Sequence, residues 1–136
     1  MAVIVVTRLR LKNPGVLNDF FNGASASLEQ AQKSLGNLGS DALAEAHDTW
    51  WTVTSWQDRT TMEAFVAAEP HHSVMNRLSD WCDEAAFVDW EQPEAALPDW
   101  QASYQHLIAD GKAADLSQAS PDNRALAYPP PVVPAQ

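Results

Sequence analysis

The sequence predicts an α+β fold of the ferredoxin-like type, with one antiparallel sheet and two helices on one of its faces. Segments with strand and helix patterns follow one another in the order strand, helix, strand, strand, helix, strand through residue 92. A short polar turn joins the second and third strands, so these two form a hairpin. Right-handed β-α-β crossovers then place the first and third strands in the centre of the sheet.

Residues 3–11 form the first predicted strand, because β-branched and aliphatic side chains alternate there between two faces. Asn13 followed by proline predicts a helix start, with asparagine as the N-cap and proline in the first turn. The helix is expected to end at Gly36, a residue suited to the left-handed conformation that closes helices. Its apolar stripe is composed of Leu17, Phe20, Phe21, Ala24, Leu28, Ala31 and Leu35.

The hairpin is predicted from a weak strand at residues 41–46 and a strong strand at residues 49–56, with a loop at residues 38–40 before it. His47 and Asp48 make the turn between the two strands. Large aromatic side chains fall on both faces of the strong strand, which indicates that both faces are covered. One face carries Trp50, Thr52, Thr54 and Trp56, and the other carries Trp51, Val53 and Ser55.

The second helix is predicted to begin at Asp58 as the N-cap, or at Thr60 with Glu63 at capping-box spacing. Pro70 divides this helix, because proline lacks the backbone donor and clashes with the preceding turn. The last strand of the core is expected at residues 85–90.

The second face of the predicted sheet also carries apolar side chains, and no core helix remains to cover it. A large apolar surface must be buried somewhere. A second copy packed face to face would bury it in a two-fold arrangement, so we expect a homodimer.

The chain is divided into three parts. Residues 1–92 form the ferredoxin-like α+β domain, residues 93–112 a C-terminal helical appendage, and residues 113–136 an extended or disordered proline-rich tail. Within the appendage a helix from Pro98 to Asp110 is expected to cover the kinked helix or to reach across the dimer.

Composition excludes several classes of function. The formal net charge is −10, which argues against nucleic acid and anionic membrane surfaces as partners. Cys82 is the single cysteine, so neither an intramolecular disulfide nor a zinc-type cluster is expected. No apolar run approaches about 20 residues, and the N-terminal charges follow the apolar run, the wrong order for a signal peptide. These observations predict a cytoplasmic protein.

Over residues 51–90 the sequence resembles the dimeric α/β-barrel superfamily, which includes antibiotic-biosynthesis monooxygenases, haem-degrading monooxygenases and chlorite dismutases. It is most similar to stand-alone bacterial proteins of unknown function related to spheroidene monooxygenase. The resemblance implies the same fold, a dimer and monooxygenase-like activity. Haem-degrading members of the superfamily use an asparagine on the first strand, and a tryptophan and a histidine on the second helix. The resemblance implies that His71 is this histidine. The first strand here has no asparagine, and the first half of the second helix has no tryptophan. The shared pattern consists of Trp56-Gln57-Asp58, Met62, Phe65 and His71-x-x-x-Met75.

His71 is the first candidate for a functional residue. It lies on the apolar stripe of the second helix, whereas His72 is rotated by about 100° to the polar side. His71 is interpreted as a general acid or base, as an axial haem ligand with Met75 nearby, or as a core histidine bonded to a neighbour. The stripe comprises His71, Val74, Met75, Leu78, Trp81 and Cys82.

Arg8 and Arg10 share one strand face, where they either hold an anionic group of a substrate or pair with acidic residues of the chain. The aromatic side chains either line a flat pocket or fill the core and the dimer seam. The proposed pocket residues are Trp51, Trp56, Phe65, Trp81 and Trp90.

These residues lead to three hypotheses. The first is a monooxygenase-like enzyme that acts on a hydrophobic or aromatic small molecule between sheet and helices. In it His71 transfers the proton and Arg8 or Arg10 orients an oxygen. The enzyme either works without a cofactor, through a substrate carbanion that reacts with dioxygen, or uses haem. The second is a haem-binding protein with His71 as the axial ligand. The third is a non-catalytic dimeric binding or interaction module.

Overall fold

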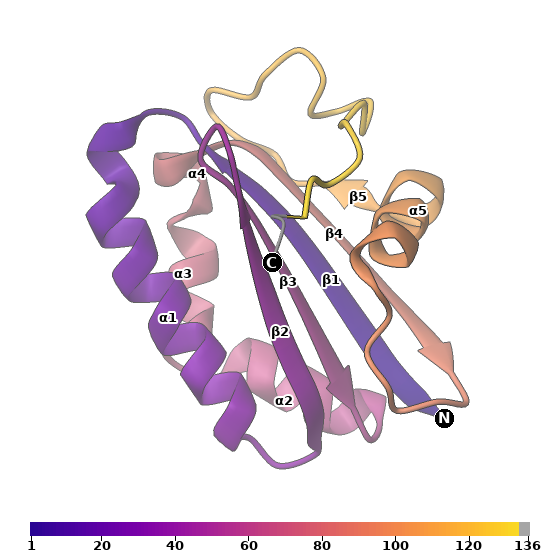
Figure 1. Cartoon of the computed structure of the whole chain (residues 1–136). Helices are drawn as coiled ribbons and strands as arrows, with labels where there is room; N and C mark the ends of the chain where they lie inside the picture. Colours follow the sequence, from indigo (N-terminus) through magenta and orange to yellow (C-terminus); the bar gives the residue numbers. More distant parts are fainter. Residues whose placement is uncertain (134–136) are drawn as a thin grey trace.

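The structure is a computed structural model that describes residues 1–133. Its centre is a five-stranded antiparallel sheet with the order β2-β3-β1-β4-β5 (Figure 1). The ferredoxin-like fold is confirmed, and the first and third predicted core strands, β1 and β3, occupy central positions. The strands are β1 Ala2–Leu11, β2 Asn37–Glu45, β3 Thr49–Trp56, β4 Cys82–Gln92 and β5 Lys112–Ala113.

All helices before β4 pack on one face of the sheet, called here the helix side (Figure 1). The N-cap Asp58 accepts a hydrogen bond from the backbone N–H of Thr61, which confirms the first of the two predicted starts of α2. Pro70 separates α2 from α3, as expected. The elements are the 3₁₀ helix η1 Pro14–Val16, α1 Leu17–Lys33, α2 Arg59–Ala67, α3 His71–Asn76 and α4 Leu78–Trp81.

Several predicted boundaries are wrong. The expected loop at residues 38–40 belongs to β2, because it pairs with the end of β3 through Gly39 opposite Ser55. Cys82 begins β4 instead of ending a helix, and it pairs with Leu11 of β1. A second break at Arg77 separates α3 from α4. In the first two cases pairing with a distant strand overrides the local pattern.

The hairpin between β2 and β3 is closed by Ala46 together with the predicted turn residues His47 and Asp48. His47 and Asp48 have φ angles of 62° and 54°, in the left-handed region that tight turns use. The turn sets a register in which Glu45 lies opposite Thr49 and Leu43 opposite Trp51. This register directs Trp50 to the helix side and Trp51 to the opposite face.

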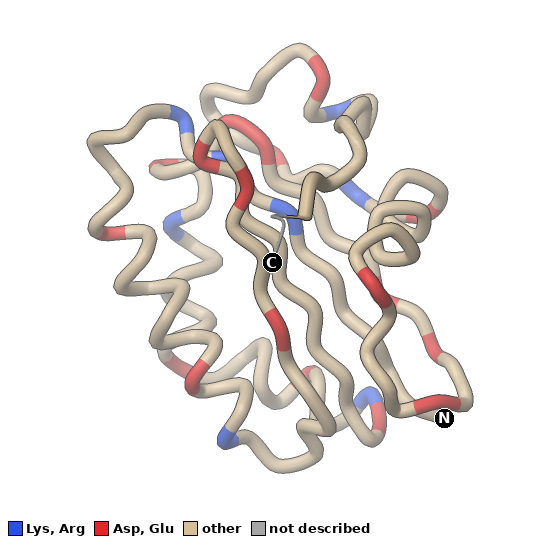
Figure 2. Tube along the Cα trace, in the orientation of Figure 1, with Lys and Arg blue, Asp and Glu red and all other residues tan. Residues whose placement is uncertain are grey.

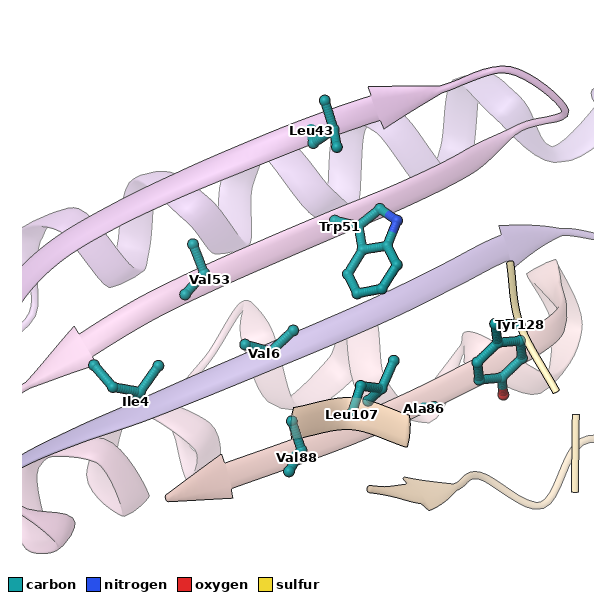
Figure 3. Packing of buried hydrophobic residues seen from close by; sticks show 9 residues of the cluster. All are labelled: Ile4, Val6, Leu43, Trp51, Val53, Ala86, Val88, Leu107 and Tyr128. Carbon is teal, nitrogen blue, oxygen red and sulfur yellow. The ribbon is translucent and has the colours of Figure 1, made fainter. Parts of the chain in front are cut away.

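The opposite face of the sheet is covered by residues 93–133, called here the C-terminal segment, which include α5 Trp100–Asp110 (Figure 1). Leu107 of α5 and Tyr128 close the apolar core on this side, and Trp51 of β3 is fully buried beneath them (Figure 3). The cluster comprises Ile4, Val6, Leu43, Trp51, Val53, Ala86, Val88, Leu107 and Tyr128.

The premise of the expected homodimer is therefore wrong. That expectation assumed that nothing in the chain covers the second face of the sheet, whereas α5 and the following residues bury it. The helix predicted from Pro98 begins at Trp100, with Asp99 as its N-cap, and it packs on the sheet instead of on the kinked helix.

The proline-rich tail follows an irregular course and packs against the sheet as far as the structure describes it. Asn123 and Tyr128 are buried, with exposed fractions of 1% and 4%. The Asn123 side chain accepts a hydrogen bond from the backbone N–H of Ala85 and donates one to the carbonyl of Ala114. The last three residues of the predicted tail, 134–136, lie outside the described residues.

Lys and Arg are scattered along the chain, while Asp and Glu are more numerous (Figure 2). Within residues 1–133 no helix is both long and apolar enough to cross a membrane.

Candidate functional site

The sheet separates His71 from the two arginines. In β1 the side chains of Thr7 and Leu9 face the helix side, whereas those of Arg8 and Arg10 face the C-terminal segment. His71 lies on α3, on the helix side. Among the cavities found in the described part of the chain, none contacts both His71 and an arginine, so the predicted single site that combines them is not assembled.

Two adjoining cavities of about 80 and 160 Å³ lie on the helix side, between α1, α3 and the strands β1 and β3. We call them together the helix-side cavity. His71 and Met75 line the smaller part, and Trp50 lines the larger part. No Asp, Glu, Lys or Arg is among the lining residues of either part. The two parts share Thr7, Leu9, Phe20, Ala24, Leu28 and Thr52.

The imidazole of His71 has a defined tautomer. Its Nδ1 lies 3.1 Å from the carbonyl oxygen of Val66. Because a carbonyl only accepts hydrogen bonds, Nδ1 carries the proton and Nε2 keeps the lone pair when the ring is neutral. Burial lowers the pKa of His71 below its usual 6.5 despite the opposing bond to Val66, and the nearby His72 lowers it further. His71 is therefore neutral at pH 7, with Nε2 able to accept a proton.

Gln30 of α1 holds the break between α2 and α3 in place. Its Oε1 accepts a hydrogen bond of 2.8 Å from the backbone N–H of His71, and its Nε2 donates one of 3.2 Å to the carbonyl of Phe65. The ring centroids of Phe65 and His71 are 4.5 Å apart. Sequence reasoning missed Gln30, because its partners are 35 and 41 residues away and no local pattern reveals them.

Two buried polar atoms belong to residues that line the helix-side cavity. Ser27 Oγ and Trp50 Nε1 have no hydrogen-bond partner among the described residues. A buried polar group without a partner costs roughly 1–3 kcal/mol, and such groups are few in native proteins. After a small shift of its side chain, each of these two residues could form a hydrogen bond with a polar atom of a ligand in the cavity.

The aromatic residues predicted to line one pocket are distributed over both sides of the sheet. Trp56 stacks on Phe65 at 4.9 Å on the helix side, near His71. Trp81 packs edge-on against Phe20 at the other end of the helix side. Trp51 borders the larger part of the helix-side cavity, but its ring belongs to the core under the C-terminal segment. Trp90 stacks on His106 of α5. These side chains mainly fill two cores.

Both arginines are paired with acidic residues of β4. Arg8 is 3% exposed and donates a 2.6 Å hydrogen bond to Glu84, with the ring centroid of Tyr128 4.2 Å from its guanidinium carbon. Arg10 makes two hydrogen bonds to Asp83, of 2.8 and 2.9 Å, and this bonding is the main cause of its raised pKa. The cavity beside them, about 460 Å³, is thus lined by arginines whose charges are already compensated.

The helix-side residues do not fit haem. The two parts of the helix-side cavity have volumes of about 80 and 160 Å³, which are small for a ring system of the size of haem. His71 and Met75 line the same cavity, but a porphyrin exceeds the space between α1, α3 and the sheet. Residues 1–133 also contain no group of three or more His, Cys, Asp or Glu side chains arranged to hold a metal ion.

No protein-family model matches the sequence, and no curated protein matches it either. Solved structures do match the fold. Rv0793 from Mycobacterium tuberculosis has a TM-score of 0.63 and 11% identity, covering 71% of this chain and 99% of its own. SnoaB, a cofactor-independent oxygenase from Streptomyces nogalater, has a TM-score of 0.58 and 13% identity, covering 72% and 98%. A structure described as an antibiotic biosynthesis monooxygenase has a TM-score of 0.59 and 12% identity, covering 68% and 99%. The chain therefore has the α+β ferredoxin-like fold of the antibiotic-biosynthesis-monooxygenase structures.

Proposed function

We propose that this protein is a small-molecule oxygenase whose substrate is a neutral, hydrophobic or aromatic molecule bound in the helix-side cavity. The observation that carries the proposal is the uncharged cavity with a neutral histidine in its wall. The larger part, about 160 Å³, is close to the roughly 150 Å³ cavity that accommodates benzene in an engineered protein. The preferred substrate is accordingly about the size of one aromatic ring, or of two rings if both parts of the cavity are filled.

The proposed chemistry needs a substrate with an acidic CH₂ group next to a carbonyl or an aromatic ring. Nε2 of His71 takes one proton from this carbon, and the resulting carbanion gives its electrons to dioxygen, which is the oxidant. A carbon–oxygen bond forms to give a hydroperoxide after the proton returns to the outer oxygen. Loss of water leaves a carbonyl, so that R₂CH₂ and O₂ yield R₂C=O and H₂O. SnoaB, a cofactor-independent oxygenase, shares the fold.

Each part of the site has a defined role in this proposal. The Val66 carbonyl and Gln30 fix the orientation of His71. The low pKa of His71 keeps it in the basic form at pH 7. Ser27 and Trp50 offer donors to a substrate oxygen. The wall is mostly apolar, which reduces the contact of the carbanion with water that would protonate it.

The test uses 2-indanone and 2-tetralone as probes, each with an activated benzylic CH₂ group. Oxygen uptake is followed with an electrode, and incorporation of label from ¹⁸O₂ is followed by mass spectrometry. We expect His71→Gln to lose at least about 100-fold in turnover, the typical scale of general base catalysis, while binding, followed by tryptophan fluorescence, is retained.

Two further variants complete the design. Ala24→Phe fills the helix-side cavity from α1 and is expected to abolish both binding and turnover, because Ala24 lines both parts. His72→Gln is the matched control, since His72 is exposed and pairs with Glu69, and turnover should be unchanged. Binding that persists in a folded Ala24→Phe variant, or turnover indifferent to His71→Gln, contradicts the proposal. Probe binding without oxygen uptake favours a non-catalytic binding module.

A further inference from the structure

The face of the sheet opposite the helix side is an apolar surface whose whole cover comes from one segment of the same chain. Ile4, Val6, Trp51 and Ala86 have an exposed fraction of 0% there, and Val53 one of 1%. In Figure 1 the C-terminal segment lies on this face, while α1 to α4 lie on the other. Without the segment, side chains from β1, β3 and β4 would form one contiguous exposed apolar patch.

The segment follows the face from one end to the other. At one end Ser55 Oγ donates a 2.8 Å hydrogen bond to the carbonyl of Ala95, and Leu97 packs over Gly39 of β2. In the middle Leu107 of α5 is fully buried among the sheet residues (Figure 3). At the other end the backbone N–H of Val132 donates a 2.6 Å hydrogen bond to Glu45. Edge strand β2 and central strand β3 are therefore bridged directly to residues 93–133.

Polar bonds attach the segment to the sheet. Asn123, 1% exposed, accepts from the backbone N–H of Ala85 at 2.9 Å and from the hydroxyl of Tyr128 at 2.7 Å. Ser120 Oγ donates to Glu84 at 2.7 Å. Tyr128 also stacks over the guanidinium of Arg8, which completes the burial of the Arg8–Glu84 pair. Release of the segment would expose this ion pair together with the apolar surface.

Eight solved structures that share the fold are too short to contain a counterpart of the whole segment. They are covered over 90–99% of their own length by only 67–72% of this chain. That share is similar in size to the core that ends with β4 at Gln92. The additional residues of this chain are thus available for a function that the core alone does not supply.

We propose that the C-terminal segment stands in for a second copy of the chain. It occupies the sheet face on which a second copy would pack, so the intact chain is a monomer, and loosening its attachment lets that face pair with the same face of another copy. An apolar sheet face can pack against the same face of a second copy around a two-fold axis, because each copy supplies the same apolar side chains of β1, β3 and β4. The proposal is independent of the proposed oxygenase activity.

The test is the molar mass of the full chain, measured by light scattering and sedimentation between about 1 and 200 µM. We expect the wild-type protein to have the monomer mass of 14.9 kDa throughout this range. Asn123→Ala removes the bonds to Ala85 and Tyr128, and we expect its mass to increase with concentration toward twice the monomer value. Arg124→Ala, at an exposed neighbouring position, is the matched control and should remain monomeric.

Amide hydrogen exchange decides how each mass is interpreted. In Asn123→Ala, residues 114–133 should exchange faster, while β1 and β3 should stay protected in the dimer. If Asn123→Ala does not fold, Tyr128→Phe, which removes only the hydroxyl bonds, takes its place. A wild-type protein of twice the monomer mass overturns the proposal. So does a folded variant with rapid exchange in the segment and a mass that stays at one copy.

Discussion

The Nδ1 atom of His71 lies 3.1 Å from the carbonyl oxygen of Val66, at the break between α2 and α3. This contact leaves Nε2 with the lone pair and keeps the ring at the wall of the helix-side cavity. The same surroundings lower the pKa of His71, mainly through burial. The position of His71 at this break therefore determines both the orientation of its ring and its protonation state.

The first prediction concerns pH. Because the pKa of His71 is lower in the folded chain than its ordinary value of 6.5, the fold favours the neutral ring. The stability from this preference is fully present above pH 6.5 and is lost as the pH falls through the folded pKa. Urea unfolding at pH 7.5, 6.5 and 5.5 should show a smaller loss of unfolding free energy for His71→Gln than for wild type. His72→Gln should keep most of the wild-type slope, because burial is the main cause of the lowered pKa of His71 and His72 contributes least. Equal slopes in all three proteins would refute the assignment.

The second prediction concerns the buried ion pair. Glu84→Gln leaves the charge of Arg8 buried without its partner, so we expect a loss of about 3–5 kcal/mol in the free energy of unfolding. Replacing both members, with Arg8→Met and Glu84→Leu, should cost less than the single change because no charge remains buried. The surface pair of Arg59 and Asp89 provides the control, since Asp89→Asn should cost about 0–1 kcal/mol. Denaturant titrations measure all of these values.

The third prediction concerns α5. Leu107 is fully buried against the sheet, so Leu107→Ala removes apolar contacts and leaves a cavity. We expect a loss of about 2–5 kcal/mol. Gln105→Ala, on the exposed face of the same helix, should change stability by less than about 0.5 kcal/mol. Similar stabilities for the two variants in thermal and urea unfolding would mean that α5 is not part of the cooperative core.

The fourth prediction concerns the turn between α1 and β2. Gly36 has a φ angle of +88°, and a Cβ atom there would overlap Thr61. Gly36→Ala should therefore destabilise the chain by more than about 1 kcal/mol. Adding Thr61→Ala removes Oγ1 and Cγ2, but it leaves the Cβ atom of residue 61, which also overlaps, and it leaves the backbone strain. The double variant should therefore recover only part of the loss. Full recovery would show that sterics alone select glycine at this position.

The fifth prediction concerns Cys82. Burial raises the pKa of its thiol to about 12, with Asp83 contributing, so the thiolate is scarce at pH 8. The thiol should not react with Ellman's reagent in the native protein at this pH, and it should react fully in urea. Rapid labelling of the folded protein would contradict the buried position of Cys82 at the start of β4.

Much of the core followed from local patterns. The strand at Thr49–Trp56, the turn at His47 and Asp48, and the helix start at Asp58 were predicted as the structure has them. Each depends on a few neighbouring residues, through alternation, turn chemistry or capping. The candidate His71 was also placed correctly on the inner side of its helix, because the helical period alone determines that position. Its chemical role stays a prediction.

The placement of the arginines could not be predicted. Alternation assigns Arg8 to one face of β1, but only the sheet order places Glu84 beside it, 76 residues away. The same order puts the arginines and His71 on opposite sides of the sheet. A sequence pattern gives the direction of each side chain relative to its own strand, and it contains no information on which distant side chain lies opposite.

The sequence by itself determined the strand and helix order, the ferredoxin-like core and the apolar faces, because these depend on periodicity over short stretches. Only the tertiary structure decided what covers the second face of the sheet. The residues that do so include Leu107, Asn123 and Tyr128, in a helix and an irregular tail whose sequence is rich in proline and polar residues. Their burial arises from contacts with distant strands, such as that of Tyr128 with Arg8, 120 residues earlier, and such contacts form only once the sheet exists.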